Sequence, residues 1–190
     1  STDGWPGPEE GTAFVATGQG GMLLSPDAGA PIDAMVGDFM AGEVEAMVME
    51  VDERRPDLIV VEGQGALSHP AYGAVSLAIH QGCFPDALVM CHDPNRTHYK
   101  AFWETRHKVT IPHLGGEIAL AERALLNTSM GEVVAVALMT VGASPMEMTR
   151  HEQTVRDTMG LVAGDVFQDG PGRFLDAVVR PLNIGGGGRG

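Results

Sequence analysis

The segment from Asp57 to Tyr72, DLIVVEGQGALSHPAY, constrains the fold of this chain more than any other. Residues 58–61 form an apolar run that is too short for a helix and rich in β-branched side chains, which is typical of a strand buried on both faces. The run ends at Glu62, and the glycines that follow let the backbone turn sharply or approach a ligand. Because open parallel sheets bind ligands at the carboxyl ends of their strands, we expect a functional site here.

Short apolar runs alternate with helical patterns along the chain. The predicted strands span 12–17, 58–61, 86–91, 133–140 and 161–167, and the predicted helices span 31–55, 73–81, 114–126, 145–159 and 174–179. This alternation predicts an α/β fold of three layers, in which helices flank a mainly parallel sheet. We expect an irregular lead-in at 1–11, a single α/β domain at 12–182 and a flexible glycine-rich tail at 183–190.

The length and apolar content set the class of protein. With 190 residues and 44% hydrophobic content, the chain is long enough for one domain with a sizeable core. No apolar run approaches the ~18 residues of a membrane helix, and no secretory signal pattern is present, so we expect a cytoplasmic protein. Cys83 and Cys91 do not form a disulfide framework, and their apolar neighbours predict reduced core thiols.

The charge balance bears on the partners of the chain. The formal net charge is −13, with 25 acidic against 12 basic residues, whereas a nucleic-acid surface needs a basic patch that neutralises phosphates. We therefore expect a small-molecule substrate and neither a nucleic-acid nor a membrane partner. The methionine-rich segment 32–49 could form an oligomer contact, although core packing is the more common use of such a helix. We expect a homo-oligomer.

Polar side chains follow three of the predicted strands, which in a parallel sheet would place them at one edge and let them converge on one cleft. They are Thr17 and Gln19, then Glu62, Gln64 and His69, then His92, Asp93 and Arg96. A glutamate such as Glu62 can hold a hydrated magnesium ion or accept a proton. His69 and His92 are candidate general bases. Substrate-binding candidates are Gln19, Gln64, Tyr72 and Arg96, of which the arginine can bind a carboxylate or phosphate through two hydrogen bonds.

Plainer interpretations exist for each of these residues. Glu62 can be an N-capping acid beside a glycine turn, and a histidine next to proline, such as His69, often stabilises a turn. His92 and Asp93 can simply cap a strand end. No Cys or His cluster has zinc-ligand spacing, so no metal site is expected. A G-x-S-x-G nucleophile motif is absent, and so is the GxxxxGK[ST] phosphate loop.

Five segments carry a family resemblance: FVATGQGG, IDAMVGDFMAG, VVEGQGALSHPAYGAVSLAIHQG, PDALVMCHDPNRTHY and IPHL. They resemble the C-terminal domain of the family first catalogued as a domain of unknown function, DUF1611, which includes bacterial D-glutamate N-acetyltransferases. The resemblance implies a P-loop NTPase type of fold related to dethiobiotin synthetase, here without the P-loop strand, turn and helix. Family members carry those elements and a Rossmann-like domain before the segment that begins here at Thr12.

The resemblance also implies a reaction. It points to an acetyltransferase that moves an acetyl group from acetyl-CoA to an acidic D-amino acid such as D-glutamate. Glu62, Gln64, His69, His92 and Arg96 stand at matching positions, and the predicted cofactor-binding residues are Thr17, Gly18, Gly63 and Gly65. Two alternatives remain open: a nucleotide-dependent enzyme with Glu62 on magnesium, and a non-catalytic module for small-molecule binding or oligomerisation.

Overall fold

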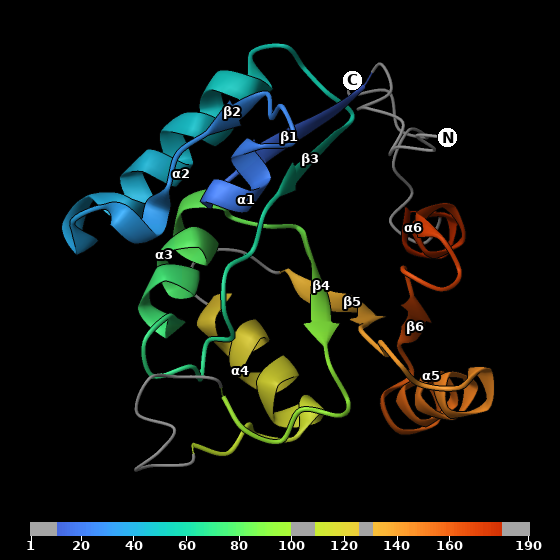
Figure 1. Ribbon diagram of the computed structural model, residues 1–190. Coiled ribbons are helices and arrows are strands. Elements are labelled where there is room, and N and C mark those ends of the chain that lie inside the picture. The colour runs from blue at the N-terminus through green and yellow to red at the C-terminus, as the bar shows by residue number, and fades with distance from the viewer. Residues whose placement is uncertain (1–10, 100–108, 126–130, 180–190) are drawn as a thin grey trace. The chain divides into compact units, whose positions relative to one another are not determined.

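The computed structural model describes residues 11–99, 109–125 and 131–179. The chain divides into two compact units, Ser1–Phe84 and Pro85–Gly190. Each unit contains a three-stranded parallel sheet flanked by helices (Figure 1), so the predicted α/β fold with parallel strands is confirmed. The prediction of a single domain over 12–182 stays a prediction, and the predicted lead-in and tail lie almost wholly outside the described residues.

The sheet of the first unit has the strand order β2-β1-β3. Its strands and helices are β1 (Thr12–Ala16), α1 (Gln19–Met22), β2 (Ala28–Gly29), the 3-10 turn η1 (Ile32–Ala34), α2 (Gly37–Asp52), β3 (Leu58–Val61) and α3 (Gly73–Cys83). In the register of β1 and β3, Ala13 lies beside Ile59 and Val15 beside Val61. The carboxyl ends of these two strands are therefore neighbours, and the residues that follow them can meet.

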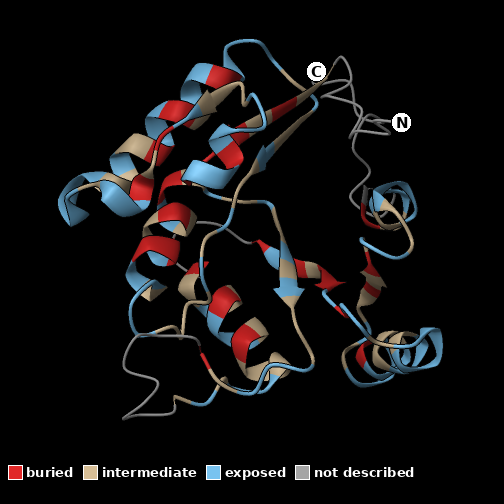
Figure 2. Ribbon diagram, in the orientation of Figure 1, coloured by how far each residue is buried: buried red, intermediate tan, exposed pale blue. Residues whose placement is uncertain are grey.

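One face of this sheet packs against α2 and α3. Alternate residues of a strand point to the same face, and Ala13 and Val15 of β1 join one buried cluster with Val44 of α2 and Ile79 of α3 (Figure 2). Met47 is buried in the same cluster, so core packing accounts for part of the methionine-rich helix. An oligomer contact through that helix stays a prediction.

Helices α2 and α3 approach each other at Gly82. A Cβ atom there would lie 2.4 Å from the carbonyl oxygen of Ala41 and 2.7 Å from Cβ of Val44. Real Cβ atoms do not come this close to a backbone oxygen, so only glycine fits without a shift of one helix. The distance between α2 and α3 therefore depends on the absence of a side chain at Gly82.

The sheet of the second unit has the order β4-β5-β6, with all strands parallel. Its elements are β4 (Ala87–His92), α4 (Leu114–Leu125), β5 (Glu132–Leu138), α5 (Pro145–Met159), β6 (Val162–Asp165) and α6 (Pro171–Val179). Val136 and Ala163 face Val155 of α5 on one side of the sheet. On the other side Phe174 of α6 packs over Gly164, so this unit has three layers.

The predicted boundaries agree with the structure within three residues except at the start of the helix from Pro31, and the short helix α1 was not predicted. The predicted helix from Pro31 begins only at Gly37, because Met35 and Val36 have extended backbone angles. The last helix begins at Pro171 instead of residue 174, and the short strand β2 was not predicted. The capping box of Ser144 and Glu147 at the start of α5 is confirmed.

The two cysteines are free, as expected, but Cys91 is exposed and Cys83 half-buried. The prediction of core thiols is therefore wrong for Cys91, which lies on the sheet-edge strand β4. Burial raises the pKa of the Cys83 thiol to about 11. Within the part of the chain that the structure describes, no helix is long and apolar enough to cross a membrane.

Candidate functional site

The exits of β1 and β3 are joined through the Glu62 carboxylate. The backbone N–H groups of Thr17 and Gly18 each donate to Glu62 Oε2, at 2.9 Å. In return, the Thr17 hydroxyl donates to the backbone carbonyl of Glu62, also at 2.9 Å. Hydrogen bonds from two N–H groups stabilise a charged carboxylate, so this acid holds the turn after the neighbouring strand.

The amide of Gln64 completes this cluster. Its Nε2 donates to Oγ1 of Thr17 at 3.2 Å, which makes the threonine hydroxyl both donor and acceptor. Gly21 lies so close that a Cβ atom would be 2.2 Å from Glu62 Oε2, so a side chain at residue 21 would displace the carboxylate from this position. The predicted grouping of Thr17, Glu62 and Gln64 is therefore seen in the structure.

The two oxygens of Glu62 differ. Oε2 accepts both N–H bonds, while no hydrogen bond among the described residues reaches Oε1. The glutamate is half-buried, and Oε1 is not among the buried side-chain atoms that lack a hydrogen-bond partner, so it is in contact with solvent. One oxygen of this carboxylate therefore holds the turn, and the other accepts no hydrogen bond from the described residues.

Hydrogen bonds and a close packing contact hold the middle of the loop from β3 to α3 in place. The Ser76 hydroxyl of α3 donates to the carbonyl of Gly65, and a Cβ atom at Gly65 would lie 2.9 Å from Cβ of Tyr72. His69 accepts at Nδ1 the N–H groups of Ala71 and Tyr72, at 3.1 and 3.2 Å. The interpretation of His69 as a turn-stabilising residue is thus confirmed, and its imidazole lies 4.9 Å from the Tyr72 ring.

Two other predicted residues of this unit lie at its surface. Gln19 is the exposed first residue of α1, and Gly63 is exposed with no atom within 4 Å of an added Cβ. Of the predicted cofactor-binding group, Thr17 and Gly18 already donate their N–H groups to Glu62. Binding of a cofactor by Thr17, Gly18, Gly63 and Gly65 stays a prediction.

The predicted residues of the second unit follow β4. Arg96 forms an ion pair with Asp93, at 3.6 Å between Nε and Oδ2, and Asp93 also accepts the N–H of Asn95. Burial lowers the pKa of His92, the neighbouring His151 lowers it further, and Asp93 acts in the opposite direction. The lowered pKa favours the neutral form of the His92 imidazole.

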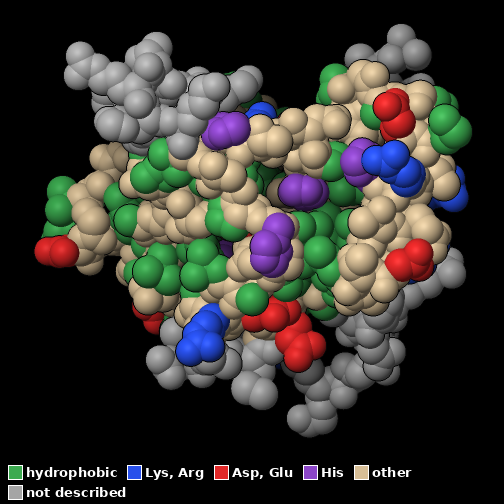
Figure 3. All heavy atoms as spheres, turned by 90° about the horizontal axis from the view of Figure 1, so that it is seen from below, with side chains coloured by type: hydrophobic (Ala, Val, Ile, Leu, Met, Phe, Trp, Pro, Cys, Tyr) green, Lys and Arg blue, Asp and Glu red, His purple; other side chains and the backbone are tan. Residues whose placement is uncertain are grey.

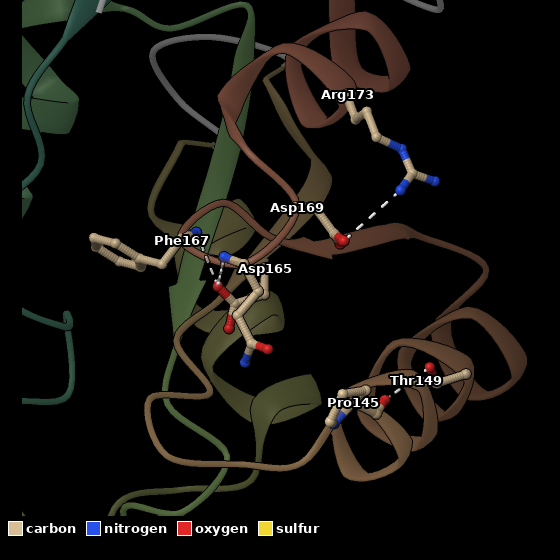
Figure 4. A network of polar contacts seen from close by, with 7 residues as sticks. Pro145, Thr149, Asp165, Phe167, Asp169 and Arg173 are labelled. Atoms are coloured by element: carbon tan, nitrogen blue, oxygen red, sulfur yellow. Dashed lines mark hydrogen bonds and ion pairs between the residues drawn. The ribbon is translucent and has the colours of Figure 1, made fainter. Parts of the chain in front are cut away.

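A second polar network lies at the carboxyl ends of β5 and β6, and the sequence analysis missed it. Asp165 Oδ2 accepts the N–H of Thr140 at 2.7 Å as well as its hydroxyl. Asp165 Oδ1 accepts the N–H groups of Phe167 and Gln168 (Figure 4). The Gln168 amide in turn donates to Oγ1 of Thr140 at 3.0 Å.

Burial would raise the pKa of Asp165, but the bonds from Thr140, Phe167 and Gln168 outweigh it and hold the pKa below its usual value. The signal for this network was present in the sequence, because Thr140 ends the predicted strand 133–140 and Asp165 lies near the end of the predicted strand 161–167. Phe167 is 71% exposed, and in Figure 4 its ring points away from the carboxylate.

The structure brings together part of the predicted site. Thr17, Gly18, Glu62 and Gln64 form one cluster, and His69 and Tyr72 form another on the following loop. Convergence of these residues with His92 and Arg96 involves both units and stays a prediction. Within the described ranges 11–99, 109–125 and 131–179, no group of three or more His, Cys, Asp or Glu side chains could hold a metal ion.

Parallel strands flanked by helices define an α/β protein, and folds of this class bind ligands at the carboxyl ends of their strands. Residues 9–175 match the family model described as "Domain of unknown function (DUF1611_C) P-loop domain". The chain belongs to the DUF1611 family.

Two bacterial relatives named "D-glutamate N-acetyltransferase" are each 36% identical to the chain. The one from Tritonibacter scottomollicae aligns over 174 residues, with 88% of this chain and 48% of the relative covered. The one from a Pseudoalteromonas species aligns over 172 residues and covers 89% and 48%. The chain thus spans about half the length of the curated relatives it matches.

A solved structure has the same fold. The crystal structure of a DUF1611 family protein from Anabaena variabilis superposes with a TM-score of 0.77 at 33% identity, covering 89% of this chain and 48% of that one. The predicted family and P-loop type of fold are thereby confirmed.

Proposed function

We propose that the chain is part of an N-acetyltransferase that moves the acetyl group of acetyl-CoA to the amino group of D-glutamate or a similar acidic D-amino acid. The observation that carries the proposal is its sequence identity with the two relatives of that name. The open carboxylate oxygen of Glu62 supports it, because acyl transfer to an amine needs a proton acceptor.

The reaction has a simple proton balance. The ammonium group gives one proton to Glu62 Oε1, and the resulting amine attacks the thioester carbonyl. The new N–C bond forms as the C–S bond breaks, and the departing thiolate takes the proton from Glu62, which gives free CoA and restores the carboxylate. The second proton of the attacking nitrogen is released, so the products are the N-acetyl amino acid, CoA and H⁺.

Glu62 fits this role because its two oxygens are used differently. Oε2 is fixed by Thr17 and Gly18, which orients Oε1 without a further partner. Arg96 and Gln64 are the proposed anchors for the substrate carboxylates, since guanidinium and amide groups hydrogen-bond carboxylate oxygens. The use of acetyl-CoA as acetyl donor and the contacts of Arg96 and Gln64 with the substrate carboxylates belong to this proposal.

The test is mass-spectrometric detection of N-acetylglutamate after incubation of the purified chain with acetyl-CoA and D-glutamate, beside L-glutamate. We expect product from the D-isomer. A folded sample that gives no product from either isomer would overturn the proposal for this chain. Stabilisation by D-glutamate or CoA without turnover would favour the non-catalytic binding module instead.

The decisive variant is Glu62→Gln. The glutamine keeps an oxygen for the N–H groups of Thr17 and Gly18 and replaces the open oxygen with an amide nitrogen, so the fold should be retained. We expect turnover to fall about 10²- to 10⁴-fold, as for loss of a general base. Glu45→Gln, at an exposed position on α2, removes the same charge elsewhere and should leave turnover unchanged.

The family description as a P-loop domain favours one second candidate, a nucleotide-dependent enzyme. Magnesium keeps several waters and often uses only one or two carboxylates, so the open oxygen of Glu62 fits such a site. Calorimetric titration with ATP, with and without magnesium, tests it. ATP binding that magnesium strengthens in the wild type but not in Glu62→Gln would support this function over acetyl transfer.

A further inference from the structure

The hydroxyl group of Thr17 makes two hydrogen bonds whose directions are fixed. It lies 2.9 Å from the backbone carbonyl oxygen of Glu62 and 3.2 Å from Nε2 of Gln64. A carbonyl oxygen can only accept, so the single hydroxyl proton points to Glu62, and a lone pair of the hydroxyl oxygen accepts an N–H of the Gln64 amide. The residues proposed above as proton acceptor and substrate anchor are therefore linked through one threonine.

The backbone of the turn after β1 acts on the same two residues. The N–H of Thr17 donates to Glu62 Oε2 at 2.9 Å. A Cβ atom at Gly21 would lie 2.2 Å from this oxygen, closer than real Cβ atoms come. A Cβ atom at Gly18 would lie 2.5 Å from Nε2 of Gln64. The turn is thus in direct contact with both side chains, and Thr17 is hydrogen-bonded to both residues.

Burial separates the side chain of Thr17 from any ligand. Thr17 is 0% exposed, whereas Glu62 and Gln64 are half-buried and keep part of their surface in contact with solvent. A hydroxyl without accessible surface cannot touch a substrate or cofactor that binds from solvent. Any effect of this hydroxyl on a reaction must therefore pass through the two residues to which it is hydrogen-bonded.

We propose that Thr17 is a positioning residue, whose buried hydroxyl holds the proton acceptor Glu62 and the substrate anchor Gln64 in one fixed arrangement. The inference rests on the proposed acetyl transfer. It replaces the sequence-based assignment of Thr17 as a cofactor-binding residue. Groups that are oriented before the substrate binds lose less entropy and need less reorganisation during the reaction, so Thr17 supports the reaction without contacting the substrate.

The second unit supplies a matched control in Thr140. This threonine is also 0% exposed, its hydroxyl donates to Asp165 Oδ2, and it accepts the Gln168 amide at 3.0 Å. Because hydrogen bonds to charged groups contribute more than neutral ones, loss of the Thr140 hydroxyl should cost at least as much stability as loss of the Thr17 hydroxyl. Thr140→Val therefore measures the effect of destabilisation alone.

Two variants at residue 17 separate the hydroxyl from the rest of the side chain. Thr17→Val keeps the shape, but the carbonyl of Glu62 loses a donor and Nε2 of Gln64 faces a methyl group. We expect kcat to fall about 10- to 100-fold through displacement of the proton acceptor. We expect KM for D-glutamate to rise about 2- to 10-fold through the misplaced anchor. Thr17→Ser restores the hydroxyl, and both constants should return close to those of the wild type.

Each kinetic result has its own meaning. Full activity of Thr17→Val, or equal losses in Thr17→Val and Thr17→Ser, would contradict the proposal, because the hydroxyl would then not be the group that acts. A rise in KM for acetyl-CoA alone would mean that Thr17 binds the cofactor and would also contradict it. Thr140→Val should leave kcat and both KM values unchanged while its Tm falls. A loss of activity in Thr140→Val as large as in Thr17→Val would reduce the effect to destabilisation.

A second measurement does not depend on turnover. In the nitrogen-15 spectrum of the labelled chain, the N–H of Gly18 and the side-chain NH₂ of Gln64 report on the two residues that Thr17 holds. We expect both signals to shift when D-glutamate is added, and both groups to exchange with solvent faster in Thr17→Val than in Thr17→Ser or Thr140→Val. Absence of these changes would overturn the positioning role. The expected changes in a wild-type chain that forms no product would count against the proposed acetyl transfer and not against the arrangement held by Thr17.

Discussion

At the scale of residues, the same arrangement of hydrogen bonds occurs in both units, but the acid at its centre differs in burial. In each, a threonine after one strand presents its N–H to an acid from the neighbouring strand, and a glutamine amide donates to the threonine hydroxyl. Asp165 is buried with both oxygens used, whereas Glu62 is half-buried with one oxygen open. The Asp165 arrangement is expected to stabilise the fold, and the Glu62 arrangement matches the proton acceptor of the proposed reaction.

The role of Asp165 leads to a prediction about stability. In Asp165→Asn, an amide nitrogen replaces one oxygen and faces the donors of either Thr140 or Phe167 and Gln168. A buried donor without an acceptor costs about 1–3 kcal/mol, and more for charged groups. We therefore expect the free energy of unfolding at pH 7 to fall by about 2–4 kcal/mol, measured by urea denaturation.

The pH dependence of this difference has a definite sign. The pKa of Asp165 is lowered from 3.8 in the folded state, so the carboxylate contributes stability that is present above pH 3.8 and lost as the pH falls through the lower folded value. The gap between wild type and Asp165→Asn should be full at pH 5–7 and shrink below pH 3.8. Asp86→Asn, at an exposed position, should show no such gap, and a gap that grows in acid would contradict the role of Asp165.

The sequence predicted the Glu62 cluster because glycines and polar residues crowd one strand exit. It did not predict that the Glu62 carboxylate would accept N–H groups of residues 17 and 18, since that bond depends on the parallel register of β1 and β3. The Asp165 network was missed for a related reason. Its acid and threonine stand 25 positions apart and become partners only through strand pairing.

At the scale of elements, apolar periodicity located most strands and helices, because burial and hydrogen bonding act over a few residues at a time. Apolar periodicity failed where contacts with residues distant in the sequence determine the local secondary structure. The short strand β2 exists through its pairing with Val15 and Ala16 of β1. The start of α2 is delayed to Gly37 after the 3-10 turn at Ile32–Ala34, whose isoleucine is buried in the core.

The contact of α2 with α3 leads to a matched pair of predictions. Gly82→Ala would place a Cβ atom 2.4 Å from the carbonyl oxygen of Ala41, and we expect a loss of about 1–3 kcal/mol, as for overpacked cores. Gly42→Ala lies in the same helix pair with nothing within 4 Å and should gain about 0.5–1 kcal/mol from higher helix propensity. Thermal unfolding of both variants checks the pair, and a stabilised Gly82→Ala would show that the helices can separate freely.

At the scale of the whole molecule, charge is the dominant sequence property, and the described part of the chain forms several ion pairs at its surface. The ion pairs found among the described residues are Arg54–Asp27, Arg96–Asp93 and Arg173–Asp169. Each has an arginine that is largely exposed, and exposed pairs contribute about 0–1 kcal/mol. Acidic side chains are visible at several places on the face drawn in Figure 3.

This balance predicts that salt stabilises the protein. With a net charge of −13, self-repulsion opposes the compact state, and raising NaCl from about 0.01 to 0.2 M shortens the screening length from about 30 Å to below 10 Å. Screening removes more repulsion than ion-pair attraction, so we expect Tm at pH 7.5 to rise by about 2–4 °C, the shift that about 1 kcal/mol produces in a chain of this size. Near the sequence pI of about 4.7 the same salt titration should leave Tm almost unchanged, because little net repulsion is left to screen. A fall in Tm with salt at pH 7.5 would mean that attractive pairs outweigh the net charge, contrary to the exposed geometry of those described.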